Sequence, residues 1–136
     1  MSTVTAAAEK NGIAKNKEMV TLFYNLAFRD LKFEEAFARY AGDTYIQHNP
    51  LIPDGKEPVV KFLNDFVKVH PMAQNEIKRV IAEGDLVVLH VLSKEHPEDR
   101  GRAIVDIFRV ENGKIVEHWD VIQSIPVKAA NNNTMF

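Results

Sequence analysis

The feature that most constrains the fold is a pair of strand-like segments near the C-terminus, within residues 102–124. Apolar and polar residues alternate on both sides of an Asn-Gly pair, which is typical of a β-hairpin. Three ionisable residues, Asp106, His118 and Asp120, lie there among apolar neighbours. Because an ionisable group on an apolar sheet face is costly to desolvate, we interpret the cluster as part of a pocket.

The length of the hairpin loop decides which of these residues face each other. A two-residue loop would pair Asp106 with Trp119, and Asp106 would then leave the pocket face of His118. A three-residue loop, with Gly113 in a left-handed bulge, would pair Asp106 with His118. We favour the longer loop because it gathers all three ionisable groups on one face. A plain structural pair between Asp106 and His118 is the alternative.

Composition limits the kind of protein that this chain can be. Its 136 residues fit one domain, and a hydrophobic content of 46% supplies a core. A net charge of −2 without a basic block argues against nucleic acid or an anionic membrane as a partner. The absence of cysteine excludes a disulfide framework and a thiol nucleophile. No apolar run reaches the roughly 18 residues of a membrane helix, and residues 1–11 do not resemble a signal peptide, so with the absence of cysteine we expect a cytoplasmic protein.

Apolar residues recur at helical spacing in the first half of the chain and at alternate positions in the second half. The expected elements are, in chain order, helix 13–29, helix 31–40, strand 45–48, helix 58–67 and strands 76–81, 86–93, 102–110 and 114–124. Short turns between the last four strands predict an antiparallel meander, and helices segregated from it predict an α+β fold. We expect a single domain over 12–126, with flexible tails at 1–11 and 127–136.

Asp120 is the first candidate for proton transfer. Burial on an apolar face would raise the pKa of its carboxyl, which suits a general acid or base near neutral pH. His118, two residues away on the same face, could share a proton or hold a substrate oxygen. Phe108 shares the face of Asp106 and is expected to contact the substrate. A structural carboxylate near the strand end is the alternative for Asp120.

Further substrate contacts are expected from Gln47, His48 and Asn49, where strand alternation directs one parity inward. Asn49 precedes a proline and could instead belong only to a turn. His90 interrupts the most apolar strand, so it is either a pocket residue or a satisfied core histidine. Two histidines and a carboxylate suffice for some metal sites, but no His-x-His or His-x-x-x-His spacing occurs, and we predict no metal.

The hexapeptide 45–50, an Asp-Gly pair shortly after it and the hairpin 105–121 resemble the SnoaL-like polyketide cyclase family. That family belongs to the nuclear transport factor 2-like superfamily, and the resemblance covers about residues 15–126. It implies a cone-like fold in which a curved antiparallel sheet wraps around three N-terminal helices and leaves an internal pocket.

The resemblance also implies roles for individual residues. Asp120 matches the general acid/base of the aldol cyclases, which need no metal or organic cofactor, and His118 matches a pocket histidine. Gln47 falls near a pocket amide position. Asp106 departs from the family pattern, because the cyclases have a histidine there, and this departure argues against a polyketide substrate.

These observations predict a small cofactor-independent enzyme that performs acid/base chemistry on a small apolar or carbonyl-containing molecule. Aldol-type cyclisation, isomerisation and dehydration share the same first proton transfer. One alternative is a non-catalytic small-molecule-binding or assembly module, and another is an epoxide-type hydrolase in which Asp120 activates water. We expect a homodimer through the outer sheet face with Trp119 as an anchor, unless Trp119 packs within its own domain.

Overall fold

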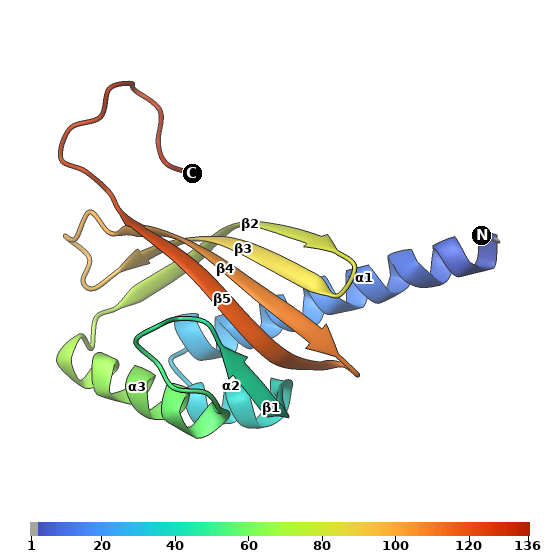
Figure 1. Ribbon diagram of the computed structural model, residues 1–136. Coiled ribbons are helices and arrows are strands. Elements are labelled where there is room, and N and C mark those ends of the chain that lie inside the picture. The colour runs from blue at the N-terminus through green and yellow to red at the C-terminus, as the bar shows by residue number, and fades with distance from the viewer. Residues whose placement is uncertain (1–2) are drawn as a thin grey trace.

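A computed structural model describes residues 3–136, which form an α+β fold, as the sequence predicts (Figure 1). Its elements are, in chain order, α1 (Thr3–Tyr24), the π-helical segment η1 (Asn25–Arg29), α2 (Phe33–Tyr40), β1 (Ala41–Gln47), α3 (Lys56–Val69), β2 (Gln74–Glu83), β3 (Leu86–Lys94), β4 (Arg102–Glu111) and β5 (Lys114–Ser124). Among the described residues, none of the helices has the length and apolar character that crossing a membrane requires.

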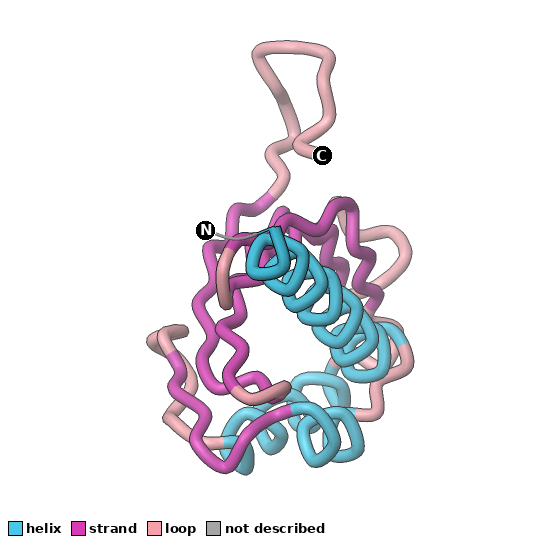
Figure 2. The backbone as a smooth tube through the Cα atoms, turned by 90° about the vertical axis from the view of Figure 1, so that its right-hand side faces the viewer, coloured by secondary structure: helices cyan, strands magenta, loops and turns pink. Residues whose placement is uncertain are grey.

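The four C-terminal strands form the expected antiparallel meander, and β1 extends it. The strand order is β1-β5-β4-β3-β2, and β1 runs parallel to β5, so the sheet as a whole is mixed. The long connection through α3 and the meander allows this parallel pairing. The sheet curves around the helices without closing into a barrel (Figure 2).

The core lies between the concave face of the sheet and the helices. In α1 and η1, Val20, Phe23 and Ala27 recur at spacings of three and four residues and are fully buried. The Phe23 ring meets Phe37 of α2 edge-on at 5.0 Å and Phe108 of β4 at 5.6 Å. These aromatic contacts tie α1 and α2 to the sheet.

The N-terminal segment differs from the expectation. Helix α1 begins at Thr3, so residues 3–11, expected as part of a flexible tail, are helical. Ala6, Ala7 and Ala8 have the highest helix propensity, which explains a helix that extends beyond its packed part. The first two residues of that expected tail lie outside the described residues.

The C-terminal segment 127–136 contains no helix or strand, and its flexibility stays a prediction. Its last residue folds back onto the sheet, because the Phe136 ring lies 5.2 Å from the ring of His90.

The loop between β4 and β5 has two residues, so the favoured three-residue loop is wrong. Glu111 pairs with Lys114, and the residues between them, Asn112 (φ 52°) and Gly113 (φ 73°), both adopt left-handed backbone conformations. Two consecutive positive φ angles are the signature of a type I′ turn, for which Asn-Gly is the preferred sequence.

A β-bulge directly after this turn changes the register. Val110 pairs with Ile115, whereas Arg109 pairs with Glu117, so Val116 is an extra residue in β5. Beyond the bulge every β5 side chain has moved by one position relative to β4. Because side chains alternate between faces, this single residue reverses which β5 residues share a face with a given β4 residue.

The bulge keeps Asp106 on the inner face in spite of the short turn. Asp106 lies opposite Asp120, and Phe108 lies opposite His118. The expected direct pairing of Asp106 with His118 is therefore wrong, as is the inference that a two-residue loop removes Asp106 from the pocket. The three ionisable residues do share one face, as expected, but a different register places them there.

Two glycine substitutions test the assignment of the turn, because they should change the free energy of unfolding in opposite directions. Gly113→Ala places a Cβ at a positive φ and should lower the free energy of unfolding by about 1–2 kcal/mol. Gly12→Ala, inside α1 with nothing near the added Cβ, should instead raise that free energy by about 0.5–1 kcal/mol. Urea denaturation measures both, and two changes of the same sign would contradict the assignment of the turn.

Candidate active site

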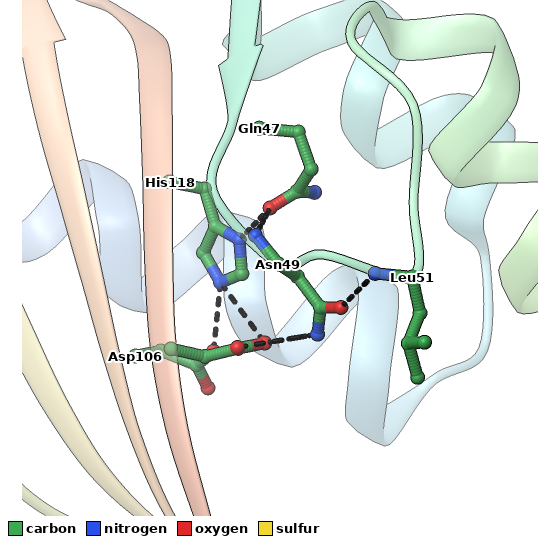
Figure 3. A network of polar contacts seen from close by, with 6 residues as sticks. Gln47, Asn49, Leu51, Asp106 and His118 are labelled. Carbon is green, nitrogen blue, oxygen red and sulfur yellow. Dashed lines mark hydrogen bonds and ion pairs between the residues drawn. The ribbon is translucent and has the colours of Figure 1, made fainter.

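A chain of hydrogen bonds on the inner face links β1, β5 and β4 (Figure 3). His118 Nε2 lies 2.8 Å from Asp106 Oδ1, and His118 Nδ1 lies 2.7 Å from Gln47 Oε1. The parallel pairing of β1 with β5 aligns Gln47 with His118 and so creates the second contact. Both His118 and Asp106 are buried.

The proton positions in this chain follow from one backbone amide. The Asn49 N–H, which can only donate, lies 3.0 Å from Gln47 Oε1 and identifies that atom as the carbonyl oxygen. Gln47 Oε1 then accepts from His118 as well, so the imidazole carries a proton on Nδ1. His118 Nε2 therefore either accepts a proton from a neutral Asp106 or donates to its carboxylate.

Asp120 lies beside this pair and is held by Asn49. The Asn49 Nδ2 group is 2.9 Å from Asp120 Oδ2 and 3.2 Å from Oδ1, while Asn49 Oδ1 accepts the Leu51 N–H at 3.0 Å. The Leu51 contact fixes which side of the amide faces Asp120. Asp120 Oδ2 is 3.9 Å from His118 Nε2, close enough for an ion pair with a protonated imidazole.

Burial controls the protonation of Asp106. Loss of hydration raises the pKa of this carboxyl above its ordinary value, the bond and charge of His118 oppose that rise, and the nearby Asp120 adds to it. Asp106 and His118 therefore form a pair that holds a proton more readily than an exposed carboxylate would. This property suits a site that must accept and return a proton.

The three ionisable groups open onto a cavity of about 200 Å³. Its walls are mostly apolar and come from η1, the three helices, the inner sheet face and the loop after β1. The cavity-lining residues Leu51, Phe62 and Ile122 are also exposed, so they mark its mouth. An engineered cavity of ~150 Å³ holds benzene, so a molecule of one or two rings suits this space.

Two buried tyrosines, Tyr24 and Tyr45, also line the cavity. Burial raises the pKa of the Tyr24 hydroxyl well above its ordinary value, and the Asp106 charge raises it further. Burial and the charges of Asp106 and Asp120 likewise raise the pKa of Tyr45. Both hydroxyls therefore stay protonated near neutral pH. Helical spacing from Val20 could have identified Tyr24 as inward-facing.

The structure brings Asp106, Asp120, His118, Gln47, Asn49 and Phe108 together at the cavity, and their catalytic and substrate-binding roles stay predictions. The Phe108 ring lies 4.9 Å from the ring of His118 and covers one side of the imidazole.

His48 does not belong to this group. It stacks on Trp119 with ring centroids 4.7 Å apart, and its Nε2 lies 2.7 Å from Glu117 Oε2. Strand alternation explains the difference, because Gln47 points inward and the next residue points outward. The substrate role predicted for His48 is therefore corrected.

His90 also lies outside the cavity. Leu89 and Val91 on either side of it are fully buried on the inner face, so His90 faces outward and contacts Arg79 and Phe136. The nearly continuous run of apolar residues in this strand concealed the alternation. The predicted substrate contact of His90 is corrected for this reason.

The cluster could also hold a metal ion. One ligand atom from each of Asp106, His118 and Asp120 lies within 4.8 Å of the other two, and carboxylates with an imidazole suit zinc or iron(II). Binding there would exchange the contact of His118 Nε2 with Asp106 for a bond to the ion. The expectation of a metal-free site stays a prediction.

Fold and site together define a small α+β protein with an apolar cavity and a buried acid/base cluster. The chain belongs to the SnoaL-like domain family, whose model matches residues 20–118. This places it in the nuclear transport factor 2-like superfamily. No curated protein matches the chain.

Solved structures that share this fold are named after several different classes of enzyme. A candidate polyketide cyclase from Bacillus cereus ATCC 10987 aligns with a TM-score of 0.67 and 22% identity over 79% of this chain and 74% of that one. AclR, a candidate hydroxylase from Streptomyces galilaeus, aligns with a TM-score of 0.63 and 23% identity over 85% of this chain and 83% of that one. A candidate ketosteroid isomerase from Kribbella flavida DSM 17836 aligns with a TM-score of 0.70 and 14% identity over 88% of this chain and 85% of that one.

The raised pKa of Asp106 predicts how stability depends on pH. The folded state binds the Asp106 proton more tightly than the unfolded state, so this residue costs stability as pH rises from about 4 through its folded pKa. Asp106→Asn, which mimics the protonated carboxyl, should therefore gain stability relative to the parent chain as pH rises.

Urea denaturation of both proteins at pH 4 and pH 8 measures this difference. A relative loss for Asp106→Asn at pH 8 would show instead that His118 holds Asp106 as a stabilised carboxylate, and would contradict the assignment.

Proposed function

We propose that this chain is an enzyme that removes a proton from a carbon next to a carbonyl group of a small apolar molecule. The observation that carries this proposal is the carboxylate of Asp120, held by Asn49 at the cavity, beside the buried His118–Asp106 pair. Proton abstraction is the first step shared by aldol-type cyclisation, isomerisation and dehydration.

Asp120 serves as the general base in this proposal. The electron pair of the broken C–H bond moves into the carbonyl group, and negative charge develops on the substrate oxygen. The contact with Asn49 Nδ2 directs the carboxylate without occupying all of its acceptor positions. Asp120 then gives the proton to a carbon of the enolate in isomerisation, to the new alkoxide in aldol addition, or to the leaving hydroxyl group in dehydration.

Gln47 is the proposed donor to the substrate oxygen. Its Oε1 is occupied by His118 and Asn49, but its Nε2 is buried without a hydrogen-bond partner. A buried donor without a partner costs about 1–3 kcal/mol, so a ligand oxygen that reaches Nε2 removes that cost. His118 and Asp106 position Gln47 and polarise its amide through the hydrogen-bond chain.

The names of the structural neighbours are compatible with this chemistry. Cyclisation and ketosteroid isomerisation, named for two of those proteins, both begin with a proton leaving carbon beside a carbonyl. Their identities to this chain are 22% and 14%, so the likeness concerns the fold, and the residues of this chain carry the proposal.

Exchange of the α-protons of 2-tetralone and related one- or two-ring ketones into D₂O tests the proposed step. Proton NMR follows this exchange without knowledge of the natural product. Asp120→Asn removes the base and should slow enzyme-dependent exchange by about 10²–10⁴-fold. Glu117→Gln is the matched control, because Glu117 lies on the outer face of the same strand and should leave the rate unchanged.

Full exchange in Asp120→Asn would contradict the proposed base. Binding of the ketones without enzyme-dependent exchange would favour a binding module. Entry of ¹⁸O from water into an epoxide-derived product would favour a hydrolase.

We also propose that two copies of the chain associate through the outer face of the sheet. Val121 and Ile81 are 66% and 57% exposed there, and Trp119 presents a half-buried indole on the same face, two residues from Val121. Exposed apolar side chains on one sheet face favour association, because pairing removes them from water.

Light scattering at micromolar concentration should therefore report a dimer mass. Val121→Lys should shift the chain to the monomer, because it places a charge in the proposed interface. Val127→Lys, in the C-terminal segment and 76% exposed, should leave the dimer intact. A monomeric parent chain, or equal effects of the two substitutions, would contradict this arrangement.

A further inference from the structure

Arg102 stands at the end of the cavity away from the acid/base cluster. It begins β4 and precedes Asp106 by four residues, so both side chains lie on the inner face of the strand. Four residues of a strand span about 13 Å, which separates the two positions along the cavity. Neither composition nor the family resemblance singled out Arg102, although its alternation with Ile104 and Asp106 could have done so.

The guanidinium of Arg102 lacks the partners that such a group normally has. Its Nε is buried without a hydrogen-bond partner, and its Nη2 makes only a long contact of 3.4 Å with Ser93 Oγ. Within residues 3–136, Arg102 forms no ion pair with a carboxylate, although its charge contributes to lowering the pKa of Asp99. A half-buried cation with unused donors costs free energy unless a ligand supplies the missing acceptors.

The surroundings of Arg102 favour a ligand over a structural role. Ser93 and Asn75, aligned across β2 and β3, add polar groups to the same end of the cavity. The Asn75 Nδ2 group donates to the Phe28 carbonyl at 3.0 Å, which anchors this side chain. Among the described residues, Arg102 is the one arginine or lysine that lines the cavity.

We propose that the substrate carries a carboxylate, which Arg102 binds with its planar fork while the reacting carbonyl lies at Asp120. This inference rests on the proposed function and names the class of substrate as a keto acid with an apolar body. The fork of a guanidinium matches the two oxygens of a carboxylate and forms two parallel charge-assisted bonds. Asp106 and Asp120 repel an anion, so the two ends of the cavity together orient the ligand.

A pair of probes of equal shape tests this inference without any turnover. The probes are 2-naphthoate and its neutral analogue 2-naphthamide, titrated into the full chain and followed by NMR and calorimetry. The parent chain should bind naphthoate about tenfold more tightly than naphthamide, because only naphthoate offers a charge to Arg102. The amide signals of Ser93 and Ile104, next to Arg102, should move on binding.

Variants of two neighbouring arginines separate a specific site from a general effect of charge. Arg102→Gln should abolish the preference for naphthoate, and Arg102→Lys should retain part of it because the charge remains without the fork. Arg100→Gln is the matched control, since Arg100 contacts the Ile125 carbonyl on the exposed surface and should leave the preference unchanged. Thermal unfolding verifies that each variant is folded.

Each outcome bears on the inference. Equal affinities of the two probes in the parent chain, no binding of naphthoate at millimolar concentration, or an unchanged preference in Arg102→Gln would overturn it. The same titration with Asp120→Asn separates this inference from the proposed function. If Asp120→Asn keeps the preference for naphthoate and also exchanges α-protons as fast as the parent chain, the enzymatic role is overturned and the carboxylate site remains intact.

Discussion

The extra residue at Val116 in β5 is the constraint on which the site depends. The Asn-Gly turn alone would place Asp106 and His118 on opposite faces of the sheet, and the bulge brings them back to one face. The same shift aligns Arg109 with Glu117 on the outer face, where Arg109 Nε lies 2.7 Å from the Glu117 carboxylate. One residue thus sorts the charged groups of two strands between the cavity and the surface.

From this register follows a hydrogen-bond chain with a defined direction. The Asn49 backbone amide orients the Gln47 side chain, Gln47 sets the tautomer of His118, and His118 contacts the buried Asp106. The side chain of Asn49 also holds Asp120, so the loop after β1 connects to both parts of the acid/base cluster. The parallel strand β1 is therefore as important to the site as the hairpin that carries the ionisable residues.

Much of the architecture could be predicted because it depends on local patterns. Alternation located the meander, and apolar residues within it marked Asp106, His118 and Asp120 as a cluster. The bulge could not be predicted, since a register shift depends on how β5 packs against both of its neighbours. His90 was misplaced because apolar residues occur on both faces of its strand and hide the alternation in the sequence. The same alternation that identified Asp106 also indicates that Arg102 faces inward.

The proton at His118 Nδ1 is central to the site, because it defines how Gln47, His118 and Asp106 act together. The measurement is ¹⁵N NMR of the two ring nitrogens of His118 across the pH range in which the protein stays folded. We predict that Nδ1 is protonated throughout, and that any change of protonation is confined to Nε2 and Asp106. A neutral His118 with its proton on Nε2 and none on Nδ1 would contradict it.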